Sequence, residues 1–245
     1  MKNNEEAVDE YKVFAALSSG DVWGLAVSGK LASGKDTIAA LVMQRLNADP
    51  CSQLSWATPL KDEMDAILAD IVSSFDQGTA IDKVRDRGIS HSEASHLVSE
   101  LWHDAASLHA RARTPKVRWA LQFLGTNVRR AQDPDYWVHR AVATAISTVG
   151  AGTSVYFTDC RFPNEVEAAR RIGLYTVRLE VSATVQAERL RNRDGLRLDH
   201  DAASHPSETA LDGYSGFDLV VNNDGPIYQA VEVIVAGMQV RARKI

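Results

Sequence analysis

Short runs of apolar residues alternate along this chain with longer segments in which apolar side chains recur at helical spacing. An apolar run bounded by glycine or polar residues predicts a buried strand, and the spaced segments predict helices that cover a sheet. This alternation indicates an α/β fold in which right-handed crossovers join the strands of a parallel, five-stranded sheet between two helical layers. Strands are expected at 22–28, 52–57, 154–158, 175–181 and 217–221, and helices at 34–46, 59–72, 164–172, 183–192 and 226–243.

The segment 76–150 interrupts the alternation because its pattern is helical throughout. Candidate helices cover 90–110, 115–131 and 134–149. We interpret the segment as a helical insertion between the second and third strands of a single domain that spans 1–245. We expect this insertion to pack over the top of the sheet.

Composition and charge narrow the class of protein. Of the 245 residues, 45% are apolar and 24% are charged, as in an ordinary globular chain. The two cysteines, Cys51 and Cys160, give no disulfide framework, no apolar stretch reaches membrane-spanning length, and the acidic N-terminus lacks the core of a secretory signal. We therefore expect a cytoplasmic protein without a membrane partner.

The net charge of −5 bears on the partners of the protein. It argues against nonspecific binding of nucleic acid, which requires a broad basic surface. It leaves room for a small anionic substrate, because a few local arginines suffice to bind one. The apolar face of a helix could serve either the core or a homodimer.

The strongest motif is a glycine-bearing loop, 29–37, between the first expected strand and the helix after it. Its glycines permit backbone conformations in which successive N–H groups point inward and, with the positive end of the helix, bind phosphate. Lys35 is placed to follow the β- and γ-phosphates of a nucleotide during transfer. The loop predicts a P-loop NTPase fold whose ATP-binding residues are Gly29, Lys30, Ala32, Ser33, Gly34, Lys35, Asp36 and Thr37.

One position of the loop departs from the general P-loop pattern. The residue after Lys35 is Asp36 where serine or threonine is expected, and Thr37 comes one residue later. Mg²⁺ prefers oxygen ligands and retains several waters, so Asp36 and Thr37 are candidate ligands, either directly or through water.

Further candidates follow the third and fourth expected strands. Asp159 and Arg161 come directly after the third strand, where open α/β sheets bind their ligands, and suit a Mg²⁺ contact and a phosphate clamp. The alternative is that Asp159 or Asn164 caps the next helix and Arg161 is solvated. Arg189 and Arg193 share one helix face and suit a mobile lid, although a basic helix end is also favoured by the helix dipole.

The insertion carries basic and aromatic side chains that could bind a phosphorylated base. Arg129 and Trp137 are the better candidates, and the others are Lys116, Arg118, Gln122, Arg130 and Tyr136. The histidines at 91, 96, 103 and 109 match no standard zinc spacing, so packed or solvated side chains are expected there.

Several motifs, taken in order, resemble those of bacteriophage deoxynucleoside monophosphate (dNMP) kinases. They span most of the chain from the P-loop to the last helix, and their combination is far more specific than any member. They are GKLASGKDT (29–37), LQFLGTNVRRAQDPDYWV (121–138), DCRFPNE (159–165), SHPSE (204–208) and FDLVVNNDG (217–225). In addition, QAERLRNRDG (186–195) resembles the lid entry of dephospho-coenzyme A kinases, and the GKD loop is similar to that of animal phosphomevalonate kinases.

This resemblance implies ATP as the phosphate donor, Mg²⁺ as the cofactor and a dNMP as the acceptor, in the host cytoplasm if the protein is of phage origin. It implies that segment 76–150 binds the acceptor and that 189–208 is a lid. Carried over by position, the catalytic residues would be Lys35, Arg161, Arg189 and Arg193. The acceptor would contact Lys61, Gln122, Arg129, Arg130, Trp137, Asp159 and Arg161; Asp159 would also serve the metal, and Asn223 and Asp224 would lie near adenine. His205 and Glu208 match the family motif, which gives them no defined role.

Two other functions fit parts of the pattern. A dephospho-coenzyme A kinase needs a base for a sugar hydroxyl, which Asp36 or Asp159 could supply. A nucleotide-dependent switch would carry an N-K-x-D guanine motif, but the nearest candidate, 222–224, lacks the lysine.

Overall fold

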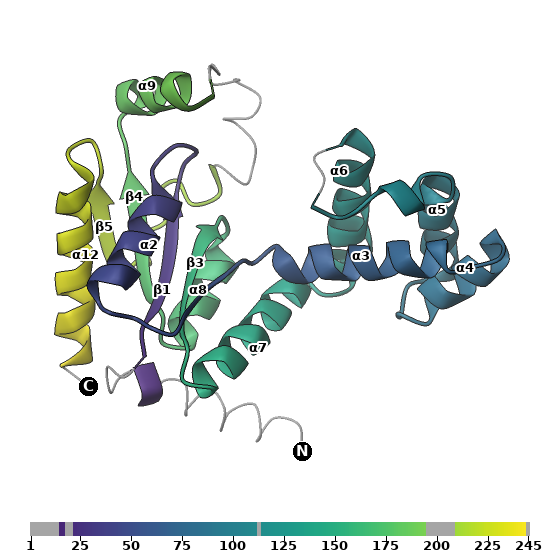
Figure 1. The fold of residues 1–245 in the computed structure, drawn as a ribbon, viewed down its shortest axis with the longest axis horizontal. Helices are drawn as coiled ribbons and strands as arrows, with labels where there is room; N and C mark the ends of the chain where they lie inside the picture. Colours follow the sequence, from purple (N-terminus) through teal and green to yellow (C-terminus); the bar gives the residue numbers. More distant parts are fainter. Residues whose placement is uncertain (1–14, 18–21, 112–113, 195–208, 244–245) are drawn as a thin grey trace. The chain divides into compact units, whose positions relative to one another are not determined.

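The computed structural model describes residues 15–17, 22–111, 114–194 and 209–243 (Figure 1). The chain forms two compact units: unit 1 comprises Met1–Trp56 and Ala141–Ile245, and unit 2 comprises Ala57–Arg140. Unit 2 therefore begins 19 residues before the start of the helical insertion expected at 76–150 and ends 10 residues before its expected end. Whether the whole chain acts as a single domain stays a prediction.

Unit 1 is built on a five-stranded sheet in which all neighbouring strands are parallel. The strand order is β2-β3-β1-β4-β5, so β1 lies at the centre. The strands are β1 (Gly24–Gly29), β2 (Cys51–Leu54), β3 (Ser154–Cys160), β4 (Tyr175–Glu180) and β5 (Leu219–Asn222). The predicted α/β fold with a parallel five-stranded sheet is confirmed, with strand ends shifted by up to three residues.

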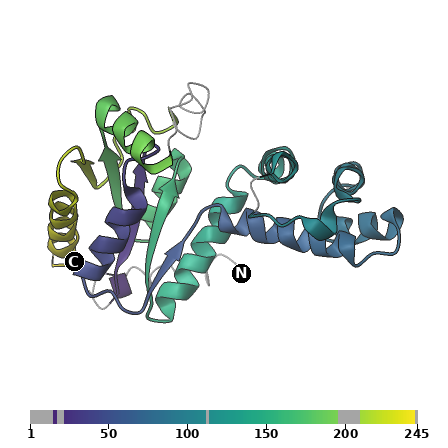
Figure 2. The same ribbon diagram turned by 45° about the horizontal axis from the view of Figure 1, so that its top comes forward.

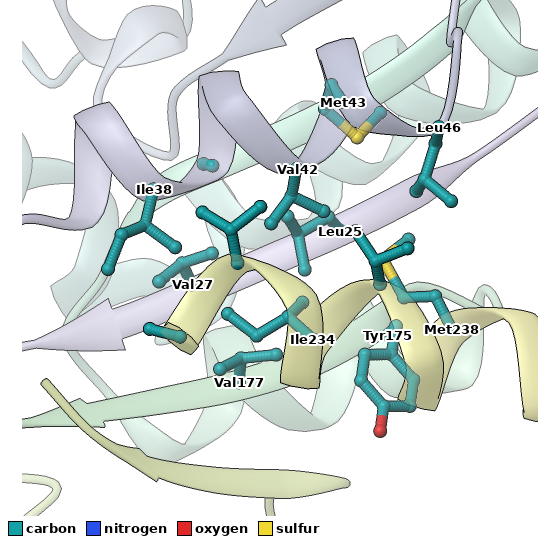
Figure 3. Packing of buried hydrophobic residues seen from close by; sticks show 14 of the residues in the cluster. Leu25, Val27, Ile38, Val42, Met43, Leu46, Tyr175, Val177, Ile234 and Met238 are labelled. Carbon is teal, nitrogen blue, oxygen red and sulfur yellow. The ribbon is translucent and has the colours of Figure 1, made fainter. Parts of the chain in front are cut away.

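One face of the sheet is covered by α2 (Lys35–Arg45) and α12 (Ile227–Ala242). Figure 3 shows Ile38 and Val42 of α2 and Ile234 of α12 packed against Leu25 of β1 and its neighbours. Alternate residues of a strand point to opposite faces, so one residue set of β1 and β4 builds this core and the other set is free for a second layer.

The second face carries α8 (Pro163–Arg171), which lies behind the sheet when α2 is in front (Figure 1). Val155 and Phe157 of β3 are fully buried, and Trp56 stacks on Phe157 with ring centroids 4.5 Å apart. Helices on both faces give the three layers expected from the alternating pattern. A further helix of unit 1, α9 (Ala183–Asp194), follows β4 and lies beyond the carboxyl ends of the strands (Figure 1).

Unit 2 is helical and has its own hydrophobic core. Its elements, distinguished along the chain by colour in Figure 2, are α3 (Thr58–Val72), α4 (Gln77–Arg85), α5 (His91–Leu101), the 3₁₀ helix η1 (Ala105–Ser107), α6 (Pro115–Gln122), the π-helix η2 (Phe123–Arg130) and α7 (Tyr136–Gly150), whose residues from Ala141 onward belong to unit 1. All of these helices lie between β2 and β3 in chain order.

Local sequence accounts for several helix starts in unit 2. The Asp76 carboxylate accepts a hydrogen bond from the Thr79 amide and begins α4, a helix that the pattern analysis missed. Ser90 and Glu93 form a reciprocal capping box at the start of α5. Thr114 caps α6, and Pro115 occupies its first turn, where a missing N–H is harmless.

Two expected helices of unit 2 differ from the structure. The helix expected at 90–110 ends at Leu101, and a 3₁₀ turn follows. The helix expected at 115–131 changes to π geometry at Phe123. Within the π segment, a Cβ on Gly125 would meet Leu60 Cδ2 at 3.1 Å, so this turn lies close against α3. Periodicity alone contains no signal for such a close approach.

Candidate phosphate-binding site

The loop between β1 and α2 has the backbone conformation that its glycines allow. Gly34 has φ of 87°, and Ala32 adopts φ of 60°, which costs a non-glycine residue about 1 kcal/mol. A Cβ on Gly29 would lie 2.5 Å from Ser33 Oγ and 2.8 Å from the Leu179 carbonyl. The loop is therefore folded tightly on itself, and strain of this kind is often found at ligand-binding sites.

The helix that follows presents its N-terminus to the loop. Its N-cap is Gly34, which makes no side-chain cap hydrogen bond to the first turn. Lys35 is the first helical residue, and its Nζ donates to the carbonyls of Gly29 at 2.7 Å and Lys30 at 3.0 Å. The ammonium group is thus held over the loop, where it would meet a bound phosphate.

Three polar atoms bordering the loop are buried without a hydrogen-bond partner among the described residues: Ser33 Oγ, Asn223 Oδ1 and Arg189 Nη1. Each buried unpaired group costs about 1–3 kcal/mol, so such groups call for an explanation. Ser33 belongs to the expected ATP-binding loop, and the resemblance assigned Asn223 and Arg189 to ATP binding as well. A ligand that pairs with these atoms would remove the cost.

The same side chains connect the loop to β5 and α9. Asn223 Nδ2 donates to the Ser33 carbonyl at 2.8 Å, and Arg189 Nη2 donates to the Asn223 carbonyl at 2.7 Å. Gln186 Nε2 donates to the Leu31 carbonyl at 2.7 Å, a contact that the sequence reading missed. The loop is therefore held by side chains far away in the sequence.

Asp224 orients the start of α9. Its carboxylate accepts from the Ser182 amide at 2.7 Å, and this hydrogen bond lowers the pKa of Asp224 below its usual range. The carboxylate is exposed and remains ionised at neutral pH. The structure thus gives Asp224 a structural contact, and its expected position near adenine stays a prediction.

The candidate metal ligands lie at two places in unit 1. Asp36 and Thr37 are exposed in the first turn of α2, and Asp36 accepts a hydrogen bond from the Thr158 hydroxyl. Asp159 accepts from Ser55 Oγ at 2.6 Å and from the Trp56 amide at 3.2 Å, and so ties the ends of β2 and β3 together. Among the described residues, no group of three or more His, Cys, Asp or Glu side chains is arranged to hold a metal ion.

The segment after β3 is organised by a side chain that the sequence reading did not single out. The Glu165 carboxylate is buried and accepts from the backbone amides of Arg161 at 2.7 Å and Phe162 at 3.2 Å. This holds the turn into α8, while the Arg161 residue itself is exposed. Glu165 therefore caps this turn, Asn164 Oδ1 also accepts from the Glu165 amide at 3.0 Å, and the phosphate-clamp role of Arg161 stays a prediction.

Cys160 lies beside these residues but has no feature of a nucleophile. It is buried, and Trp56 Nε1 lies 3.0 Å from its sulfur. Burial, followed by the charges of Glu165 and Asp159, raises the pKa of the Cys160 thiol well above its usual range. The thiol stays protonated at neutral pH, and nucleophilic cysteine chemistry requires the thiolate.

The parallel sheet, the glycine-bearing loop after β1 and the helix α2 that follows have the arrangement that a phosphate-binding P-loop requires. No family model matches the chain. Over 110 residues, the chain is 32% identical to an uncharacterized protein, ORF77, of Ictalurid herpesvirus 1 (strain Auburn). The match covers 44% of this chain and 42% of that protein, so the chain spans less than half of the length of this relative.

A comparison with solved structures gives a gluconokinase from Sinorhizobium meliloti 1021. The TM-score is 0.46 at 15% identity, with 91% of this chain and 94% of that chain covered. This likeness is too distant to bear on the substrate. Among the described residues, no helix has the length and hydrophobicity needed to span a membrane.

Unit 2 contains the residues that the resemblance assigned to the acceptor. Arg129 is buried and donates to Glu63 Oε1 from Nε at 2.8 Å and from Nη2 at 2.5 Å, and also to the carbonyls of Arg87 and Gly88. Trp137 is buried as well, and its Nε1 donates to the Gly125 carbonyl at 3.1 Å.

The other acceptor candidates of unit 2 are more accessible. Gln122 is exposed, and Lys61 and Arg130 are half-buried. His96 packs edge-on against Trp119 and Phe123, as expected for a packed histidine. The side chain of Arg193, the segment 195–208 and with it His205 and Glu208 lie outside the described residues, so the lid expected at 189–208 stays a prediction.

Proposed function

We propose that this protein is an ATP-dependent phosphotransferase that transfers the γ-phosphoryl group of ATP to the phosphate of a deoxynucleoside monophosphate. The observation that carries the proposal is the P-loop itself. Lys35 is held over it at the start of α2, and buried polar atoms at its border have no hydrogen-bond partner among the residues that the structure describes. The resemblance of the motifs to dNMP kinases supports the choice of acceptor.

The chemical problem for such an enzyme is to bring two polyanions together. The acceptor phosphate is already anionic at neutral pH and needs little help from a base. At about 4 Å, two like unit charges repel each other by roughly 4 kcal/mol at an effective dielectric constant near 20. Lys35, Arg161, Arg189 and Arg193 would offset this repulsion and stabilise the charge of the transferring group.

The oxygen atoms near the loop fit Mg²⁺ as a cofactor. Mg²⁺ is bound by oxygen atoms, usually those of one or two carboxylates, waters and substrate phosphates. The exposed Asp36 carboxylate, the Asp159 carboxylate and the Thr37 hydroxyl would supply protein oxygens for it. When bound, the ion neutralises phosphate charge. The Thr158 hydroxyl, by donating to Asp36, fixes the direction in which that carboxylate faces.

The test is a phosphorylation assay with the full chain, ATP and Mg²⁺. The four dNMPs, their ribose counterparts and dephospho-coenzyme A serve as acceptors, and products are separated by ion-exchange chromatography. We expect a nucleoside diphosphate to form from at least one dNMP. ATP hydrolysis at the same rate with and without acceptors would instead favour a nucleotide-dependent switch, and phosphorylation of dephospho-coenzyme A alone would replace the acceptor class.

A further inference from the structure

A charged residue stands in the middle of a buried strand next to the P-loop. Arg178 of β4 is in register with Ser28 of β1, the residue immediately before Gly29, and its side chain is 10% exposed. Its neighbours Val177 and Leu179 belong to the core under α2 and α12, where Figure 3 shows Val177 beside Ile234. Because side chains alternate along a strand, Arg178 projects to the opposite face of the sheet.

The guanidinium is held in place by a defined hydrogen bond. Ser28 Oγ donates to the Cys160 carbonyl at 2.9 Å, so its lone pairs are free to accept, and Arg178 Nη1 donates to it at 2.9 Å. The second nitrogen, Nη2, lies 3.3 Å from Asp212 Oδ1. Arg178 is therefore fixed at the start of the loop with one side turned to an acid.

That acid is shared by a second cation. Asp212 Oδ2 accepts from the Nζ of Lys30, the loop residue after Gly29, at 2.9 Å. The side chains of Asp212 and Lys30 are 44% and 43% exposed, so water reaches this end of the cluster. One carboxylate thus balances two cations, and its pair with Lys30 is of the exposed kind in which the attraction is weak.

We propose that Lys30 and Arg178 bind the phosphate of the acceptor, and that Asp212 occupies their binding site as an internal counter-ion until the acceptor displaces it. The inference rests on the proposed function, and it moves Lys30 from the ATP site to the acceptor site. A phosphomonoester carries more charge and more acceptor oxygens than a carboxylate, so it satisfies both cations better than Asp212 does. The position on the face opposite α2 assigns the pair to the acceptor, since the N-terminus of α2 and Lys35 take the donor phosphates.

The proposal predicts opposite effects for the two partners of one ion pair. Arg178→Met should weaken dNMP binding by about tenfold or more, the size of a lost charge-assisted hydrogen bond. Asp212→Asn should strengthen it by about twofold to fivefold, since it removes a competing charge of the kind that an exposed ion pair supplies. If the ion pair only stabilised the fold, both variants would weaken binding.

The experiment is titration calorimetry on the full chain with a non-hydrolysable ATP analogue bound, so that the P-loop is filled. Each dNMP, the matching deoxynucleoside and inorganic phosphate are titrated into the wild type, Arg178→Met, Arg178→Lys and Asp212→Asn. Affinity for the ATP analogue is measured separately. The exposed pair Arg45–Glu232, at 3.0 Å, supplies the matched controls Arg45→Met and Glu232→Gln.

We expect the Arg178 and Asp212 variants to move dNMP affinity in opposite directions, with Arg178→Lys intermediate, deoxynucleoside binding unchanged and ATP-analogue affinity within about twofold of wild type. Equal loss of ATP affinity, parallel losses in both variants or unchanged dNMP binding in Arg178→Met would overturn the assignment. A wild type that binds the ATP analogue and inorganic phosphate but no dNMP would refute the dNMP acceptor alone, and the phosphate titrations of the variants would then decide the Lys30–Arg178 site. Binding of neither dNMP nor phosphate would refute the site itself. Matching unfolding midpoints of the Arg178 variants and the wild type establish that the losses do not arise from misfolding.

Discussion

Two arginines, Arg129 in unit 2 and Arg178 in unit 1, are both buried but have very different partners. Arg129 donates hydrogen bonds to the Glu63 carboxylate and to two backbone carbonyls, and the side chains of Arg129 and Glu63 are 5% and 7% exposed. Arg178 donates to the Ser28 hydroxyl and to the Asp212 carboxylate, whose side chain is 44% exposed and is also paired with Lys30. Glu63 also accepts from Tyr136 and Arg140, whereas the surroundings of the P-loop contain buried polar atoms that have no hydrogen-bond partner in the described part of the chain.

The difference separates a structural charge cluster from a binding site. A buried ion pair in which every donor is matched is strongly coupled to the fold, and breaking it is costly. Unsatisfied groups and weakly held cations are left where a ligand completes the hydrogen bonding. We therefore infer that Arg129 stabilises unit 2. Its predicted contact with the acceptor would require the ion pair with Glu63 to break.

The largest expected effect tests the structural role of the buried Glu63–Arg129 pair. Glu63→Gln leaves the Arg129 guanidinium buried without its counter-charge, which should destabilise unit 2 by about 3–5 kcal/mol. Hydrogen exchange of the amides in α3 and η2 of the full chain would measure this loss. The exposed pair Arg85–Asp82 gives the control Asp82→Asn, for which we expect a change below about 0.5 kcal/mol. Unchanged protection in Glu63→Gln would contradict the structural role.

The second prediction tests the role of the P-loop lysine in phosphoryl transfer. Lys35→Ala removes the ammonium group held over the loop carbonyls and should lower the rate of phosphoryl transfer by about 10²–10³-fold, or roughly 3–4 kcal/mol of transition-state stabilisation. The unfolding midpoint should stay near that of the wild type. Steady-state kinetics with saturating ATP and dNMP provide the measurement, and Lys83→Ala, a half-buried lysine of unit 2 whose Nζ donates to Ser73, is the control. A rate within threefold of wild type would remove Lys35 from the mechanism.

A smaller effect sharpens the comparison at the border of the loop. Asn223→Ala deletes the donor to the Ser33 carbonyl and the unpaired Oδ1 together, so ATP binding should weaken by about fivefold to tenfold, or roughly 1 kcal/mol. Fluorescence titration with a labelled ATP analogue measures it. Gln239→Ala, an exposed amide of α12, should leave the affinity unchanged. Equal affinities in both variants would mean that Asn223 contributes only to folding.

The smallest effect concerns pH. Burial raises the pKa of Cys160, so the folded state favours the protonated thiol; this stability is complete below the pKa of the unfolded thiol and is lost as pH rises through that of the folded one. We expect the free energy of unfolding to decline above about pH 8.5. Denaturant titrations from pH 7 to 10 should show that Cys160→Ala loses less stability over this range than the wild type. The same dependence of unfolding free energy on pH in the two proteins would show that ionisation of Cys160 is not coupled to folding.

Much of unit 1 could be predicted from the sequence because its signals are local. The run before Gly29 is apolar and bounded by a glycine, and the helix after Gly34 has an apolar face that meets β1, so both elements were located. The missed elements lacked such signals. Helix α4 is short and begins at a single capping residue, Asp76, while the π turn at Gly125 depends on packing against Leu60.

Candidate site residues divide along the same line. Lys35 and Ser33 could be assigned because the P-loop is a contiguous motif whose backbone geometry creates the site. Arg178 was missed, although a lone arginine between apolar neighbours in a predicted buried strand is itself a signal that its charge has a partner. Its partner could not be located from the pattern.

By itself, the sequence determined the parallel sheet, the P-loop after its first strand and the helical segment inserted after the second strand, because hydrophobic period and glycine position act over a few residues. Tertiary structure alone decided which charges are matched. Glu63 and Arg129 are 66 residues apart, and Arg178 and Asp212 are 34 apart. The energy of a charge depends on its burial and on the nearest opposite charge, and both are fixed only when distant segments pack together.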